Sequence, residues 1–161
     1  MSTAVPPSPA PSVVVPPSGR SAGLNVEISS FLGQLRPTIP PPVFAQLEGV
    51  LARLEAARVG AGAPVVGDHA PDVAFVDGAG ARVPLRALTA DGPLVLLFFR
   101  GGWCVFCDLT LRGYERMADQ FRAAGARLVA VSPQTAEATA ATGAARALTF
   151  ELLRDPDNAA A

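Results

Sequence analysis

Residues 91–117, DGPLVLLFFRGGWCVFCDLTLRGYERM, decide the fold because one short stretch combines a strand, a tight loop and a helix. The continuous apolar run 94–99, bounded by Gly-Pro and by Arg100, is typical of a strand buried on both faces of a sheet. After the Gly-Gly pair, apolar and small residues recur at the helical period and predict a helix that begins near Cys104 and ends at Gly125. These recurring residues are Cys107, Leu111, Tyr114, Ala118 and Phe121.

The sequence around this unit predicts a parallel sheet with helices on its faces. Residues 126–132, ARLVAVS, form a second buried strand, so 94–131 is a βαβ unit of the right-handed, parallel kind. Upstream, VAFV (73–76) and RVPL (82–85) flank an Asp-Gly turn and predict a β-hairpin. Downstream, an Ala-rich helix (135–147) and a short strand (148–153) follow. The fold class predicted is therefore α/β, with a hairpin and a βαβ unit in a three-layer sandwich.

The N-terminal third of the chain has a different character. Residues 1–22 are rich in Pro, Ala and Ser and are expected to form a disordered tail, because this composition cannot build a core. Apolar residues at helical spacing in 25–35 and 42–58 predict two helices, separated by prolines, that form a helical hairpin within 23–60. A Gly/Pro-containing linker leads to the α/β domain, 65–161.

Composition excludes several classes of function. The chain has 161 residues, room for one ordinary domain, a formal net charge of −1, and 13 basic residues that are all Arg and form no run. This predicts no nucleic-acid partner and no anionic membrane surface. The longest apolar run is far shorter than the ~20 residues that span a bilayer, and the N-terminus lacks a secretory pattern, so a cytoplasmic location is expected.

The chemistry of the chain is predicted to lie in the W-C-x-x-C motif. A thiol at the N-terminus of a helix is stabilised as thiolate by unpaired N–H groups and by the helix dipole. Arg100 is close enough in sequence to add positive charge, and Trp103 is expected to pack around the site. Cys104 and Cys107 are spaced so that one sulfur can attack an oxidant and the other can resolve the product, with no metal or organic cofactor.

Other interpretations of the two cysteines stay open at this point. A structural zinc site needs four ligands, and the chain offers a single histidine, His69, in a loop. Zinc shared by the CxxC pairs of two chains is a further alternative. Free cysteines are also common as small buried apolar residues.

Four stretches together resemble the peroxiredoxin-like AhpC/TSA family of thioredoxin-fold proteins. They are VGDHAPDVAFVDGAGARVPLRAL, GPLVLLFFRGGWCVFCDLTLRGYERM, ARLVAVSPQTAEAT and LTFELLRDPDNAAA. The helical hairpin is similar to an N-terminal extension found in the branch of this family that carries a CxxC. The resemblance implies a thiol-dependent antioxidant oxidoreductase that reduces hydroperoxides and is recycled by an external thiol donor such as thioredoxin. A thioredoxin-like thiol-disulfide oxidoreductase is the alternative.

The resemblance also implies roles for single residues. Peroxiredoxins carry P-x-x-x-T-x-x-C in this loop, and the last Cys attacks the peroxide. Cys107 falls on that position, Cys104 on the Thr position and Arg100 on the Pro position. In thioredoxins, by contrast, the first Cys of W-C-x-x-C is the nucleophile, which here is Cys104.

Members of the family continue beyond the segment that ends this chain. We therefore expect a C-terminally truncated domain in which strand 94–99 keeps its neighbour 127–131 but lacks partners on its other side. Such an apolar edge is a predicted aggregation site. Either the sequence is a fragment of a longer chain, or another chain completes the sheet, as in a homodimer. A truncated, non-catalytic remnant is the remaining alternative.

Overall fold

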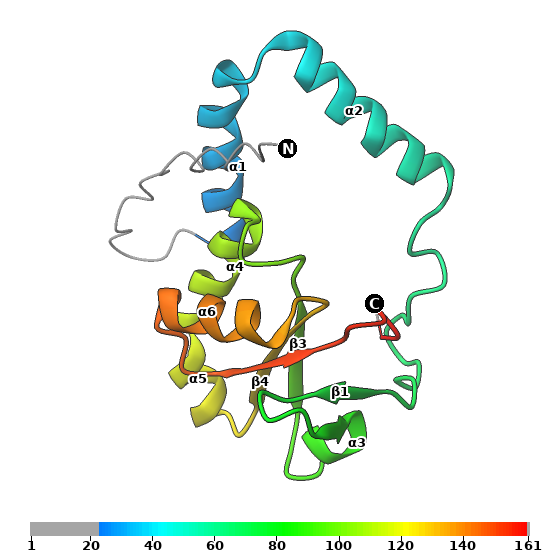
Figure 1. The fold of residues 1–161 in the computed structure, drawn as a ribbon, viewed down its shortest axis with the longest axis vertical. Helices are drawn as coiled ribbons and strands as arrows, with labels where there is room; N and C mark the ends of the chain where they lie inside the picture. Colours follow the sequence, from blue (N-terminus) through cyan, green and yellow to red (C-terminus); the bar gives the residue numbers. More distant parts are fainter. Residues whose placement is uncertain (1–22, 161) are drawn as a thin grey trace, which may run out of the picture.

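The computed structural model describes residues 23–160, which form an α/β fold with a five-stranded sheet (Figure 1). The predicted tail, 1–22, lies outside the described residues. The strands are β1 (Ala74–Val76), β2 (Arg82–Pro84), β3 (Leu94–Phe98), β4 (Arg127–Ser132) and β5 (Glu151–Arg154). The helices are α1 (Leu24–Leu35), the 3-10 segment η1 (Arg36–Thr38), α2 (Pro41–Ala56), α3 (Leu85–Leu88), α4 (Val105–Glu115), α5 (Ala118–Ala123) and α6 (Ala136–Arg146).

The sheet has the strand order β2-β1-β5-β4-β3. β3 pairs with β4 in parallel, with Leu96 opposite Val129, and β4 pairs with β5 in parallel. β1 is antiparallel to both β2 and β5. These pairings confirm the predicted hairpin and the predicted βαβ unit. β3 lies at one end of the order, so among the described strands it has a partner on one side only.

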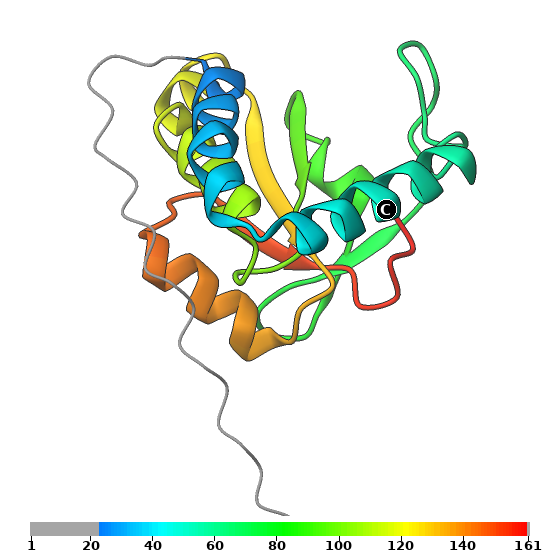
Figure 2. The same ribbon diagram turned by 90° about the horizontal axis from the view of Figure 1, so that it is seen from above.

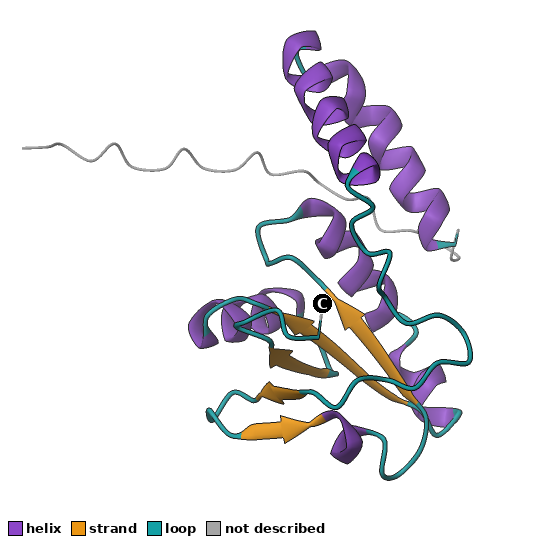
Figure 3. Cartoon of the chain, turned by 90° about the vertical axis from the view of Figure 1, so that its right-hand side faces the viewer, coloured by secondary structure: helices purple, strands orange, loops and turns teal. Residues whose placement is uncertain are grey.

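The two faces of the sheet bury separate apolar clusters, because side chains alternate along each strand. One cluster joins Val129, Val131 and Leu153 to Phe75 and to Leu88 of α3. The other joins Ala130 and Phe99 to Leu111 of α4, with Leu152 and Cys107 packed against it. Figure 3 shows the strands gathered together, with helices on either side of them. This arrangement confirms the predicted three layers.

The helix expected from Cys104 to Gly125 is interrupted near Met117. Met117 has φ −106° and ψ 0°, and its N–H donates to the Tyr114 carbonyl three residues back, so α4 ends and α5 begins there. Tyr114 and Phe121 nevertheless stack with ring centroids 5.9 Å apart across the break. Gly125 ends α5 with φ +73°, as predicted from its role as a helix stop.

Of the two N-terminal helices, α1 lies beside α4 (Figure 2). The Phe31 and Phe106 rings meet edge to face at 5.6 Å, and Glu27 accepts a hydrogen bond from Arg116 at 2.6 Å. α2 turns away after η1 and leaves its apolar stripe exposed to solvent. That stripe comprises Val43, Leu47, Val50, Leu51 and Leu54. None of the helices in residues 23–160 has the length and apolar character needed to cross a bilayer.

Candidate active site

The two cysteines lie where strand β3 passes into helix α4, as the sequence predicts. The prediction that this strand is buried on both faces is wrong, because β3 lies at one end of the strand order, where its residues are only half-buried and Phe98 is exposed. β3 ends at Phe98, the loop 99–103 turns the chain, and Cys104 is the N-cap residue of α4 with extended backbone angles of φ −90° and ψ 113°. Cys104 is buried, whereas Cys107 in the first turn of α4 is partly exposed and packs on the cluster around Phe99. The structure therefore brings both sulfurs to one end of α4.

The electrostatics of Cys104 favour its thiolate. Burial opposes the charged form, but the nearby Cys107 side chain and the backbone N–H groups of Cys107 and Phe106 favour it, and together they lower the pKa of Cys104 below its ordinary value. The positive charge of Arg100 acts in the same direction. The Cys107 side chain is the largest of these favourable effects, and the unpaired N–H groups at the helix end add to it.

Cys107 has the opposite tendency. Burial raises the pKa of Cys107, and the neighbouring Cys104 side chain raises it further. The backbone N–H of Arg100, 3.3 Å from the Cys107 sulfur, acts against this shift but does not reverse it. Of the two thiols, Cys104 is therefore the one that loses its proton at the lower pH.

Arg100 and Trp103, both expected at the site, are stacked on each other. The Arg100 guanidinium lies over the Trp103 ring, 4.7 Å from the ring centroid, a distance typical of a cation–π contact. The Trp103 side chain is 67 % exposed, so it forms an outer rim of the site and is not a wall of the core. The contact holds a positive charge close to the cysteine loop.

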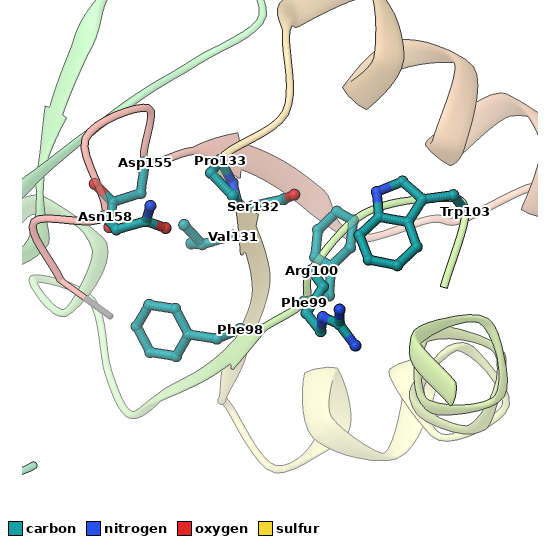
Figure 4. A pocket seen from close by; sticks show the side chains of 9 residues that line it. All are labelled: Phe98, Phe99, Arg100, Trp103, Val131, Ser132, Pro133, Asp155 and Asn158. Carbon is teal, nitrogen blue, oxygen red and sulfur yellow. The ribbon is translucent and has the colours of Figure 1, made fainter. Parts of the chain in front are cut away.

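A cavity of about 330 Å³ opens beside this rim, at the ends of β3 and β4 (Figure 4). Phe98 and Val131 supply apolar walls, and the turn that contains Asp155 and Asn158 closes one side. Arg100 and Trp103 border the cavity, while neither cysteine lines it. The cavity is therefore a neighbour of the thiol pair.

Two charged residues, Asp108 and Arg146, lie at the site although no sequence pattern predicts them there. Asp108, directly after Cys107, accepts a hydrogen bond from Arg146 of α6 at 2.5 Å and another from Arg112 at 2.9 Å. Arg146 also donates to the Gly102 carbonyl at 2.9 Å. Arg146 is 44 residues from Gly102 in the chain, so the contact depends on how α6 packs.

The described residues contain no cluster of three or more His, Cys, Asp or Glu side chains that could hold a metal ion. His69 is exposed in the loop before β1 and is remote in sequence from the cysteines. The groups that the structure brings together at the site are two thiols, and the pKa of one is lowered while that of the other is raised.

A strand–loop–helix unit with W-C-x-x-C at the helix start, built on a central parallel sheet, defines a thioredoxin-like α/β protein. The sequence profile of the AhpC/TSA family matches residues 66–161, more than half of the chain. The chain therefore belongs to the AhpC/TSA family.

Solved structures agree with this assignment. Peroxidoxin BcpB from Mycobacterium tuberculosis is 26 % identical, with a TM-score of 0.55 over 58 % of this chain and 61 % of that one. Reduced Prx3 from Vibrio vulnificus, determined in complex with hydrogen peroxide, is 26 % identical, with a TM-score of 0.54 over 60 % of this chain and 64 % of that one. The chain thus spans less than two thirds of the length of these structures. No curated protein sequence matches it.

Proposed function

We propose that the chain carries the redox centre of a thiol-dependent peroxidase that reduces hydroperoxides through Cys104 and Cys107. The observation that supports this most is the placement of two free cysteines at the start of α4, where the pKa of Cys104 is lowered and that of Cys107 is raised. Membership of the AhpC/TSA family and the likeness to a peroxiredoxin solved with hydrogen peroxide point to the same chemistry.

The proposed cycle begins with attack by the Cys104 thiolate on the terminal oxygen of a hydroperoxide. A sulfur–oxygen bond forms and the oxygen–oxygen bond breaks, which gives a sulfenic acid on Cys104 and an alkoxide or hydroxide. The leaving oxygen takes the proton of Cys107, and this turns Cys107 into a thiolate. That thiolate attacks the Cys104 sulfur, forms the disulfide and expels hydroxide, which becomes water by taking a proton from an acid of the buffer. Each thiol has then lost one electron, and the peroxide has gained two.

The disulfide returns to two thiols by exchange with an external thiol donor such as thioredoxin. The donor's first thiolate forms a mixed disulfide, and its second thiol releases the reduced chain. The Trp103 rim is exposed beside the pair and offers a surface on which such a donor can approach. No organic cofactor takes part in this cycle.

The position within the family assigns the attacking sulfur to Cys107, and that assignment stays a prediction. We favour Cys104 because a nucleophile must be ionised at the working pH, and the contacts at the N-cap stabilise its charge. The same contacts support a second candidate function, thiol–disulfide exchange with protein substrates, in which the first Cys of the motif also attacks.

The test is a stopped-flow measurement of Trp103 fluorescence, because Trp103 is the single tryptophan of the chain. Reduced protein is mixed with hydrogen peroxide, with an alkyl hydroperoxide, and separately with a small disulfide. Cys107→Ser is expected to react once with peroxide and stop at the sulfenic acid, while Cys104→Ser is expected to be unreactive. Reaction of Cys104→Ser would instead support Cys107 as the attacking sulfur. Reaction with the disulfide alone would support the second candidate and overturn the peroxidase.

A further inference from the structure

The side chain of Arg146 contacts the chain on both sides of Cys104. Its Nη2 donates to the carbonyl of Gly102, two residues before Cys104, at 2.9 Å. Its Nε donates to the carboxylate of Asp108, four residues after Cys104, at 2.5 Å. The Arg146 side chain is 10 % exposed and that of Asp108 is 20 % exposed, so this ion pair is far less open to water than an ordinary surface pair.

Gly102 is also held from its other side. Its N–H donates to Oε1 of Gln134 at 2.8 Å, and the amide nitrogen of Gln134 donates to the Thr142 hydroxyl at 3.3 Å. There is no free space around this peptide, because a Cβ placed on Gly102 would lie 2.5 Å from that hydroxyl oxygen. The segment that begins α6 and the helix itself therefore fix both the N–H and the carbonyl of Gly102.

Cys104 lies between these two fixed points. Its N–H donates to the Gly101 carbonyl at 3.1 Å, and its own carbonyl accepts the first helical hydrogen bond, from Asp108 N–H, at 2.9 Å. We propose that Arg146 is a positioning residue that holds Cys104 at the N-cap of α4, through Gly102 on one side and Asp108 on the other.

The positive charge of Arg146 should also favour the thiolate of Cys104. The Asp108 carboxylate lies in the first turn of α4, where a negative charge opposes a thiolate at the helix end. Arg146 and Arg112 each pair with one of its oxygens. Arg100 and Cys107 are the ionisable groups whose effect on the Cys104 sulfur is resolved. We expect loss of Arg146 to loosen the loop and to leave the Asp108 charge less compensated, and both changes should raise the pKa of Cys104.

This inference deepens the proposed function because it concerns the same sulfur, but its test uses no peroxide. The full chain is reduced, and the pH dependence of Cys104 alkylation by iodoacetamide is followed by peptide mass spectrometry. For Arg146→Gln we expect the apparent pKa to rise by about one unit, which gives ~10-fold slower alkylation near neutral pH. Failure of the peroxidase proposal alone would leave these alkylation profiles as described.

Arg112→Gln is the matched control. Arg112 pairs with the same carboxylate, but its side chain is 47 % exposed and it makes no contact with the loop, so we expect less than about a twofold change. An equal effect of Arg112→Gln and Arg146→Gln would show that charge alone matters and would overturn the positioning role. An unchanged profile in folded Arg146→Gln would also overturn it.

Gln134→Ala keeps the inference testable if Arg146→Gln does not fold. This change removes the hydrogen bond to Gly102 N–H and alters no charge. We expect slower alkylation of Cys104 by about two- to threefold, the size of a partly lost hydrogen bond. Circular dichroism and a thermal melt establish which variants are folded. A folded Gln134→Ala with the wild-type profile would contradict the proposal.

Discussion

The backbone N–H of Arg100 lies 3.3 Å from the sulfur of Cys107 and donates a hydrogen bond to it. This contact joins the loop that follows β3 to the first turn of α4 across seven residues, so the loop leaving the sheet fixes the place of the second cysteine. The first cysteine is fixed differently, by the N-cap of the helix. The two thiols of one short motif therefore have unequal surroundings.

The two cysteines should titrate apart. The pKa of Cys104 is lowered and that of Cys107 is raised, so alkylation of Cys104 should begin at lower pH than alkylation of Cys107. This difference in alkylation should vanish in urea, where the pKa values of both cysteines approach the ordinary value of ~8.5. Peptide mass spectrometry after pulses of iodoacetamide at stepped pH measures both rates. Equal rates in the folded chain would contradict the asymmetry.

These shifts also set a stability dependence on pH. Cys104 has its pKa lowered on folding, so its contribution is present above the unfolded pKa and is lost as the pH falls through the folded pKa. Cys107 has its pKa raised, so stability is lost as the pH rises above the unfolded value. Urea unfolding measures the free energy of unfolding across this pH range. Cys104→Ser should lack the loss of stability at falling pH, and Cys107→Ser should lack the loss of stability at rising pH.

Replacing Arg100 with Met should weaken the Cys104 thiolate modestly. The substitution removes a nearby positive charge, but the residue is exposed and solvent screens it, so we expect alkylation near neutral pH to slow by about two- to fourfold. The fluorescence of Trp103 should change as well, because the guanidinium stacks on its ring. Arg82→Met, on the remote strand β2, is the control and should change neither signal.

The fold that carries the site depends on the cluster around Leu153. Leu153 is fully buried in β5, so Leu153→Ala should lower the free energy of unfolding by about 2–5 kcal/mol. Leu51→Ala is the matched control, because Leu51 of α2 is 52 % exposed, and the change should stay within about 0.5 kcal/mol. Urea denaturation measures both. A similar cost at the two positions would mean that α2 is covered in solution.

The open side of β3 should make the chain prone to association. Phe98 at the end of β3 is 49 % exposed, and a strand edge with exposed apolar side chains templates pairing with other chains. Phe98→Lys should slow the growth of light scattering on warming, whereas Val66→Lys, at a fully exposed loop position, should not. Equal behaviour of the two variants would show that association arises elsewhere.

Much of this architecture could be predicted from short-range patterns. The apolar run of β3, the alternation of β1 and β2 about an Asp-Gly turn, and the helical spacing after Cys104 each specify an element, and the order of elements then specifies the parallel βαβ unit. The chemical character of the CxxC at a helix start follows from the same local reasoning.

Contacts between distant segments could not be predicted in this way. The hydrogen bond from Arg146 to the Gly102 carbonyl depends on the packing of α6, and the Arg116–Glu27 ion pair depends on α1 lying beside α4. Nothing in the sequence distinguishes an arginine whose side chain is largely buried and paired, such as Arg146, from one that is exposed to solvent. The break at Met117 was missed for a related reason, since the apolar spacing continues through it and only the backbone shows the interruption.

The central claim is that Cys104 and Cys107 form a disulfide by reducing a hydroperoxide, and the intact mass of the protein tests it most directly. Fully reduced chain is mixed with one equivalent of hydrogen peroxide, quenched with acid and weighed by mass spectrometry. We expect loss of two hydrogen atoms, a Cys104–Cys107 crosslink in the peptide digest, and full reversal by a dithiol, with no such change in Cys104→Ser or Cys107→Ser. An unchanged protein mass, together with peroxide that decays no faster than it does in buffer alone, would contradict it.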